Sequence, residues 1–156
     1  LKIMRGSLIE LLPDLSQNDA SEIIHSLLGR SIFIRYLEDR RDSDGNNVFP
    51  DGFFSKFVKG AASFTEVLPN KEATYQLFYY LNDKHKFNGY LFPVSQLEKE
   101  QIEERHLEEL RLFLTGNARL SDRQLRFWKF YSFDVKIVRT LYKLAGIRTR
   151  ISDRRL

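Results

Sequence analysis

Two carboxylates and a lysine are the side chains with which this sequence could perform hydrolysis. Asp134 and Lys136 are separated by one residue, and Asp51 follows Pro50 far upstream. In metal-dependent nucleases, two carboxylates and a lysine hold Mg²⁺ and position the attacking water. Such a site needs a β-sheet that carries both carboxylates, whereas the sequence between the two halves predicts helices. The pattern therefore does not favour the hypothesis of a small nuclease.

The histidines and glycines indicate no other catalytic site. His25, His85 and His106 lie far apart on different segments, so we expect helix residues rather than metal ligands. The sequence contains no glycine-rich phosphate loop, no G-x-S-x-G motif and no H-E-x-x-H motif. We therefore assign no catalytic, cofactor-binding or metal-binding residue.

Charge is distributed unevenly along the chain. Residues 1–116 hold 14 Lys+Arg against 18 Asp+Glu, whereas residues 117–156 hold 11 against 3, a net charge of +8. A segment of this kind often contacts a polyanion, although it can also be solvated or pair with acidic residues upstream. The basic residues recur at helical spacing. The expected contacts to the DNA backbone are Arg119, Arg123, Arg126, Lys129, Arg139 and Lys143.

Composition limits where the protein acts. The sequence has no cysteine, so it can form neither a disulfide framework nor a thiolate metal site. No apolar run approaches the roughly 20 residues that cross a bilayer, and the first residues are too polar for a signal peptide. We expect a cytoplasmic protein without a membrane partner. Because the chain starts at Leu1 rather than Met, we also expect it to be a piece of a longer protein.

Helical patterns predict an all-α fold, an irregular helical bundle with one or two elaborated loops. One domain is expected over residues 1–156, with 147–156 as a flexible tail. The least regular part is 43–70. The expected helices cover 3–12, 20–41, 71–86, 95–115, 120–130 and 135–146.

Capping residues set the expected helix boundaries. Asp19 or Ser21 is expected to cap the second helix, and Asn70 the third. Ser95 with Glu98 fits a capping box at the start of a helix that Gly116 ends.

The second expected helix is apolar on two sides, which predicts a central helix with neighbours all round. One stripe contains Ile23, Leu27, Phe33, Ile34 and Leu37, and the opposite one contains Ile24, Leu28, Ile32 and Tyr36. Arg30 falls in the middle of the first stripe, where a charge is stable only when it is paired. We expect a structural ion pair with a carboxylate of another segment, and contact with a ligand phosphate is the alternative. Gly29 costs about 1 kcal/mol relative to Ala, which a closely approaching helix or loop would explain.

The stretch FNGYLFP (residues 87–93) places apolar side chains around an Asn-Gly pair. Asn-Gly between apolar residues is a hairpin signal, but a proline and a helical sequence follow directly. We therefore expect an ordered structural loop. Asn88 and Gly89 make the turn, and Phe87, Leu91 and Phe92 pack against the helices.

Three segments, in order along the chain, resemble the helical region that precedes the catalytic domain of adenine-specific DNA methyltransferases. They are LLGRSIFIRYLEDRR (27–41), YQLFYYLNDKHKFNGYLFP (75–93) and FWKFYSFDVKIVRTLYK (127–143). These enzymes belong to restriction–modification systems, including single-chain type IIG enzymes. The resemblance covers most of residues 20–143.

The resemblance implies a non-catalytic helical domain that braces a methyltransferase module of the same chain and contacts double-stranded DNA. S-adenosylmethionine would be the cofactor of the parent enzyme, not of this segment. The family's cofactor-binding loop and its Asn/Asp-Pro-Pro-aromatic motif, which would hydrogen-bond the amino group of a flipped adenine, do not occur in these residues.

A helical protein-interaction module without a nucleic-acid role is the alternative. A Glu-rich stretch supports it, because its apolar residues fall on one face of an amphipathic helix. These residues are Leu97, Ile102, Leu107, Leu110, Phe113 and Leu114.

Overall fold

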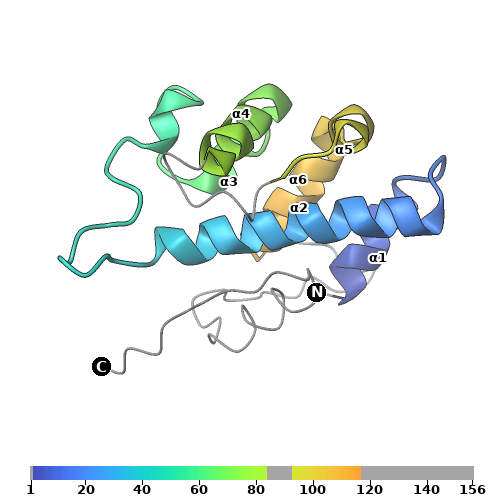
Figure 1. Cartoon of the computed structure of the whole chain (residues 1–156), viewed down its shortest axis with the longest axis horizontal. Coiled ribbons are helices and arrows are strands. Elements are labelled where there is room, and N and C mark those ends of the chain that lie inside the picture. The colour runs from blue at the N-terminus through green and yellow to red at the C-terminus, as the bar shows by residue number, and fades with distance from the viewer. Residues whose placement is uncertain (1, 84–92, 117–156) are drawn as a thin grey trace.

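The computed structural model describes residues 2–83 and 93–116, and within these ranges the protein consists of helices and loops (Figure 1). The described residues contain no β-strand, only an isolated bridge between Arg41 and Asn47. The predicted all-α fold is confirmed. The elements are α1 (Lys2–Glu10), α2 (Gln17–Glu38), the 3₁₀ turn η1 (Phe54–Lys56), α3 (Phe64–Val67), α4 (Lys71–Asn82), α5 (Gln96–Gln101) and α6 (Glu104–Leu114).

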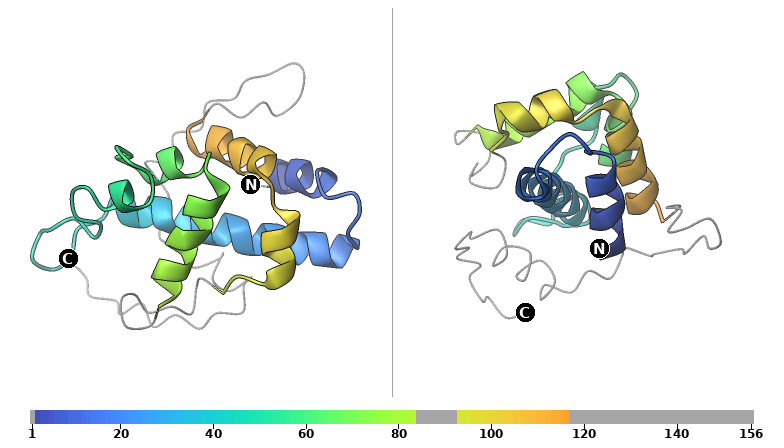
Figure 2. Two further views of the ribbon diagram at one scale, coloured as in Figure 1. Left: turned by 90° about the horizontal axis from the view of Figure 1, so that it is seen from above. Right: turned by 90° about the vertical axis from the view of Figure 1, so that its right-hand side faces the viewer.

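The longest helix, α2, runs along the length of the molecule, with α4, α5 and α6 on one side of it (Figures 1 and 2). It begins earlier than the sequence predicted. Ser16 is the N-cap, and its hydroxyl accepts a hydrogen bond from the backbone N–H of Asp19 at 3.1 Å. The predicted caps Asp19 and Ser21 were wrong, because both residues lie inside the helix.

Most residues of both apolar stripes of α2 are buried, but part of the helix surface is left uncovered by the described residues. Glu22, His25 and Ser26 are exposed, and Gly29 and Phe33 continue this edge as half-buried residues. Within residues 2–83 and 93–116, the predicted neighbours do not cover this edge. A Cβ atom placed on Gly29 would meet no atom of the described residues within 4 Å, so none of them makes the predicted close approach at this glycine.

A buried histidine fastens α6 to the end of α1. His106 is fully buried, and its Nδ1 accepts a hydrogen bond from the backbone N–H of Glu103 at 2.9 Å. The ring is therefore the tautomer with hydrogen on Nε2, which donates to the carbonyl of Leu11 at 3.0 Å. Both ring nitrogens are satisfied within the protein, and α1 packs beside both α2 and α6 (Figure 2).

The Glu-rich stretch forms two helices rather than the predicted single helix from Ser95 to Thr115. The break lies at Ile102 and Glu103, both in extended conformation. Ser95 does cap α5, but the Glu98 carboxylate points into the core, so the predicted capping box was wrong. Leu97, which was expected on the apolar face of that single helix, is 38% exposed. Gly116 ends α6 as predicted, at a φ of 81°.

Aromatic rings fill the core beneath the irregular segment between α2 and α4. Phe49, Phe53 and Phe54 are buried, and their ring centroids lie 4.7–5.2 Å apart. Phe57 and Tyr80 pack edge-on against Phe53, each with a centroid distance of 5.7 Å. This long loop is therefore ordered by burial of its own side chains. At its end Asn70 caps α4 as predicted, by accepting from the N–H of Ala73 at 2.9 Å.

Candidate functional site

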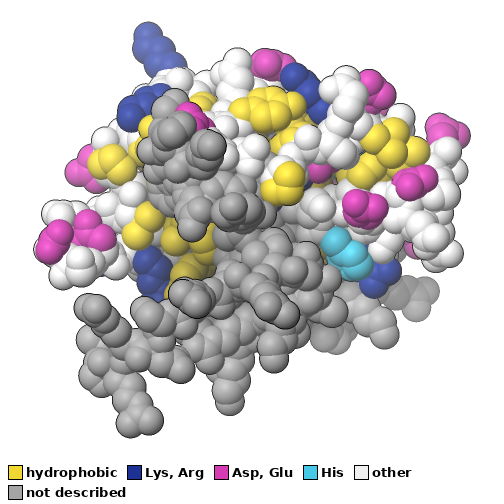
Figure 3. Space-filling view, viewed as in Figure 1, with side chains coloured by type: hydrophobic (Ala, Val, Ile, Leu, Met, Phe, Trp, Pro, Cys, Tyr) yellow, Lys and Arg dark blue, Asp and Glu magenta, His cyan; other side chains and the backbone are white. Residues whose placement is uncertain are grey.

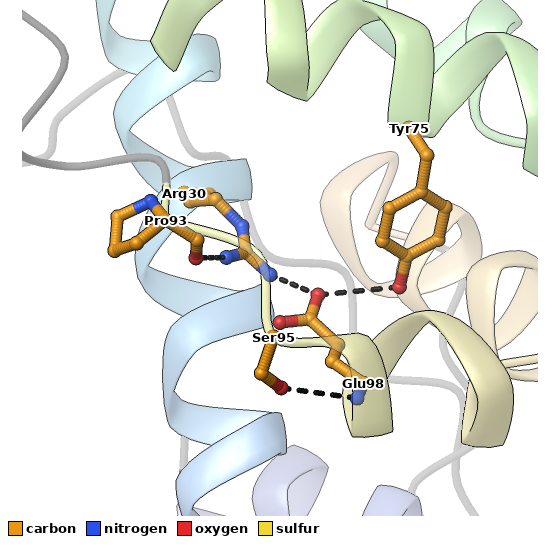
Figure 4. A network of polar contacts seen from close by, with 5 residues as sticks. All are labelled: Arg30, Tyr75, Pro93, Ser95 and Glu98. Carbon is orange, nitrogen blue, oxygen red and sulfur yellow. Dashed lines mark hydrogen bonds and ion pairs between the residues drawn. The ribbon is translucent and has the colours of Figure 1, made fainter.

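The largest buried charged side chain of the described core is Arg30, in the middle of α2 (Figure 4). One terminal nitrogen of its guanidinium donates to Oε1 of Glu98 on α5, and the other donates to the carbonyl of Pro93. The two charged side chains are 1% and 2% exposed. The sequence predicted a buried Arg30 paired with a carboxylate of another segment, and this prediction is confirmed.

Tyr75 on α4 completes the polar group, because its hydroxyl donates to the same Oε1 of Glu98 at 3.2 Å. Burial raises the pKa of the Glu98 carboxyl, while Arg30 and Tyr75 lower it, and the net direction is upward. Burial and the nearby carboxylate also raise the pKa of the Tyr75 hydroxyl. Tyr75 is therefore a hydrogen-bond donor to Glu98, not an acid.

The Phe78 ring lies beneath the guanidinium, with its centroid 4.8 Å from the central carbon of Arg30. The arginine therefore contacts α4 and α5 as well as the segment that leads into α5. Its Nε atom is buried and has no hydrogen-bond partner among the described residues. The geometry is that of a structural ion pair, in which the two charged groups bond to each other and to neighbouring protein groups. We draw no catalytic role from it.

A half-buried carboxylate, that of Glu38, joins the end of α2 to the beginning of α3. Glu38 accepts from the backbone N–H of Phe64 at 2.9 Å and from the guanidinium of Arg35 at 2.5 Å. Burial raises the pKa of the Glu38 carboxyl more than Arg35 lowers it. This contact holds the far end of the ordered loop against α2.

The described surface carries two large exposed apolar side chains, Tyr79 at 44% and Leu97 at 38%. They come from α4 and α5, and the Nζ atom of Lys99 lies 5.5 Å from the centroid of the Tyr79 ring. The face drawn in Figure 3 mixes apolar side chains with charges of both signs.

Most residues that the sequence singled out as contacts lie outside the described residues. These are the backbone-contacting residues Arg119, Arg123, Arg126, Lys129, Arg139 and Lys143, and the loop residues Phe87, Asn88, Gly89, Leu91 and Phe92.

The carboxylates and histidines weighed for catalysis are not brought together where they are described. Asp51 is exposed in a turn, while Asp134, Lys136 and His85 lie outside the described residues. His25 and His106 are on different helices, one exposed and one buried. No group of three or more His, Asp or Glu side chains that could hold a metal ion occurs within residues 2–83 and 93–116.

Sequence reasoning missed the partners of Arg30. Glu98 was assigned to a cap because it follows Ser95 by three residues, and Tyr75 was only one aromatic among many. No described helix has both the length and the apolar character needed to cross a membrane. No family model, curated protein or solved structure matches the chain.

Proposed function

We propose that the chain is a non-catalytic helical domain of an adenine-specific DNA methyltransferase of a restriction–modification system. In this role it would brace the catalytic module of the same chain and contact the backbone of double-stranded DNA. The observation that carries the proposal is the meeting of two segments that resemble this family. Arg30 of segment 27–41 bonds to Pro93 of segment 75–93, and Tyr75 of the latter reaches the same ion pair through Glu98.

This contact suits a brace because it joins three helices at a desolvated point. A buried ion pair adds little net stability compared with apolar residues, but it is costly to break on one side. It therefore favours one arrangement of α2, α4 and α5 over others, and a rigid arrangement is what positions a neighbouring module. S-adenosylmethionine would bind that module, and the protein would act in the cytoplasm.

The contact with DNA is proposed for the basic segment 117–156, whose net charge is +8. Phosphate contacts position a protein and carry no base information. Affinity should fall with salt, with a log–log slope of about −0.9 per neutralised phosphate, and the dissociation constant should lie at roughly 10⁻⁴ to 10⁻⁶ M.

Fluorescence anisotropy of a labelled duplex across a salt series tests this proposal. The variant Arg119→Glu, Arg123→Glu, Arg126→Glu should bind more weakly and with a shallower salt slope than the native chain. The matched control is Lys56→Glu, Lys59→Glu, Arg105→Glu, which makes the same charge change at exposed positions outside the basic segment. Equal binding by the two triple variants would contradict the proposal.

A protein-interaction module is the second candidate, favoured by the exposed side chains of Tyr79 and Leu97. It predicts no duplex binding even at low salt, together with a protein partner or self-association. Sedimentation of the native chain and of Tyr79→Ser, Leu97→Ser would then differ in apparent mass.

A further inference from the structure

A second cationic group lies where α1 crosses α2, on the exposed edge of the long helix. Arg5 of α1 donates from Nη2 to the hydroxyl oxygen of Ser21 at 3.2 Å. His25 follows Ser21 by four residues on α2, so the two side chains share one face of the helix. Three side chains with hydrogens to donate are thus gathered from two helices.

The group lacks an anion among the described residues. None of the described ion pairs includes Arg5, and its Nε atom is buried without a hydrogen-bond partner. Asp19, on the preceding turn, accepts a hydrogen bond from Ser16 at 2.7 Å instead. A half-buried guanidinium is normally satisfied by a carboxylate or a phosphate, because its charge and its donors both need acceptors.

The electrostatics of His25 agree with this geometry. Partial burial and, second, the positive charge of Arg5 lower the pKa of its imidazole. Glu22, an exposed residue of α2, carries the carboxylate closest in sequence to Ser21 and His25. It forms none of the described ion pairs.

We propose that Arg5, Ser21 and His25 form a binding site for one phosphoryl group, either of free phosphate or of a nucleic-acid backbone. In the bound state the Arg5 guanidinium, the Ser21 hydroxyl and the His25 imidazole N–H would each donate to a phosphoryl oxygen. Ser21 accepts from Arg5 and so keeps its own hydrogen for the ligand. The inference does not depend on the proposed role of residues 117–156, because it concerns only α1 and α2.

The test is an NMR titration of the His25 imidazole with inorganic phosphate at constant ionic strength. A bound phosphate favours the imidazolium, so the pKa of His25 should rise on titration. Arg5→Gln should weaken phosphate binding about tenfold, as expected for the loss of a charged hydrogen-bond donor. Arg40→Gln is the matched control. Arg40 is an exposed arginine that lies beyond the end of α2 and stacks on the Tyr36 ring.

A short duplex in place of phosphate identifies the source of the phosphoryl group. A rise in the His25 pKa with duplex only, lost in Arg5→Gln, assigns the site to a nucleic-acid backbone. A rise with both ligands assigns it to phosphoryl groups in general. The inference is overturned if neither ligand moves the His25 pKa, or if Arg5→Gln and Arg40→Gln respond alike.

A second readout covers the case in which Arg5→Gln does not fold. Phosphate should raise the thermal midpoint of the native chain, because it binds only the folded state. His25→Gln, at an exposed position, should reduce this rise, and Glu22→Gln should enlarge it by removing a repelling charge. Equal rises in all three proteins would overturn the site. Failure of the DNA proposal is distinguishable, since Arg119→Glu, Arg123→Glu, Arg126→Glu would leave the response of His25 to phosphate intact.

Discussion

Replacing Arg30 with alanine should be among the most damaging single changes to the described core. The change removes the partner of Glu98, the donor to Pro93 and the cation above the Phe78 ring. Breaking one side of a buried ion pair typically costs about 3–5 kcal/mol, and a domain of this size is stable by about 5–15 kcal/mol. We expect a loss near the upper end, because three contacts disappear from a side chain that is 1% exposed.

The cost should also depend on pH, because Arg30 is a group that lowers the pKa of Glu98. Without it, the pKa of the buried carboxyl rises further above its ordinary value of 4.5. A carboxyl whose pKa is raised by folding contributes stability below its unfolded pKa, and this contribution is lost as pH rises through the folded value. Arg30→Ala should therefore cost more at pH 7 than at pH 4.5. Adding Glu98→Gln should remove this difference.

Urea unfolding followed by circular dichroism at the two pH values measures both effects. Arg105→Ala is the control, since Arg105 pairs with Glu103 at the surface, where both side chains are 59% exposed. Such a pair contributes about 0–1 kcal/mol. A cost for Arg30→Ala no larger than that of Arg105→Ala would refute the reasoning. So would a cost that is the same at both pH values.

Three further substitutions test other parts of the fold by the same unfolding measurement. Gly29→Ala should stabilise the protein by about 0.5–1 kcal/mol, because the added methyl meets no atom of the described residues and the unfolded chain loses freedom; destabilisation would show that another part of the chain occupies that space. Ser16→Ala should lower the free energy of unfolding by about 1 kcal/mol through loss of the α2 N-cap. A change within error would indicate that a later residue is the N-cap. His106→Ala should cost about 3 kcal/mol or more, since it leaves a cavity and removes the partner of two part-buried backbone groups; far-UV spectra of all variants at low denaturant check that they remain folded.

The sequence predicted those features of the fold that depend on local chemistry. Asn70 and Gly116 mark helix ends because a side-chain oxygen and a positive φ act within one turn of the chain. Arg30 was placed in the core correctly because a helical stripe is periodic. In each case the deciding interaction, or the pattern that reveals it, lies within a few residues.

The break between α5 and α6 could not be predicted in this way. No glycine or proline lies between Ser95 and Gly116, and the residues at the break are ordinary helix formers. On either side of the break, a side chain contacts a residue that is distant in sequence. Glu98 bonds to Arg30, and His106 bonds to Leu11. The same reason hid Tyr75 as a partner of the ion pair, since nothing local distinguishes it from Tyr79 or Tyr80.

The contact between Leu11 and His106 has a consequence for synthesis of the chain on the ribosome. Its two ends are 95 residues apart, and those of the Arg30–Glu98 pair are 68 apart. At about 5–20 residues per second, roughly 5–20 s pass between synthesis of Leu11 and of His106, and roughly 3–14 s between synthesis of Arg30 and of Glu98. During this interval α2 has emerged with two apolar stripes and an unpaired Arg30. The nascent chain therefore exposes this apolar surface until α5 and α6 leave the exit tunnel, and the packing of α2 is completed late rather than segment by segment.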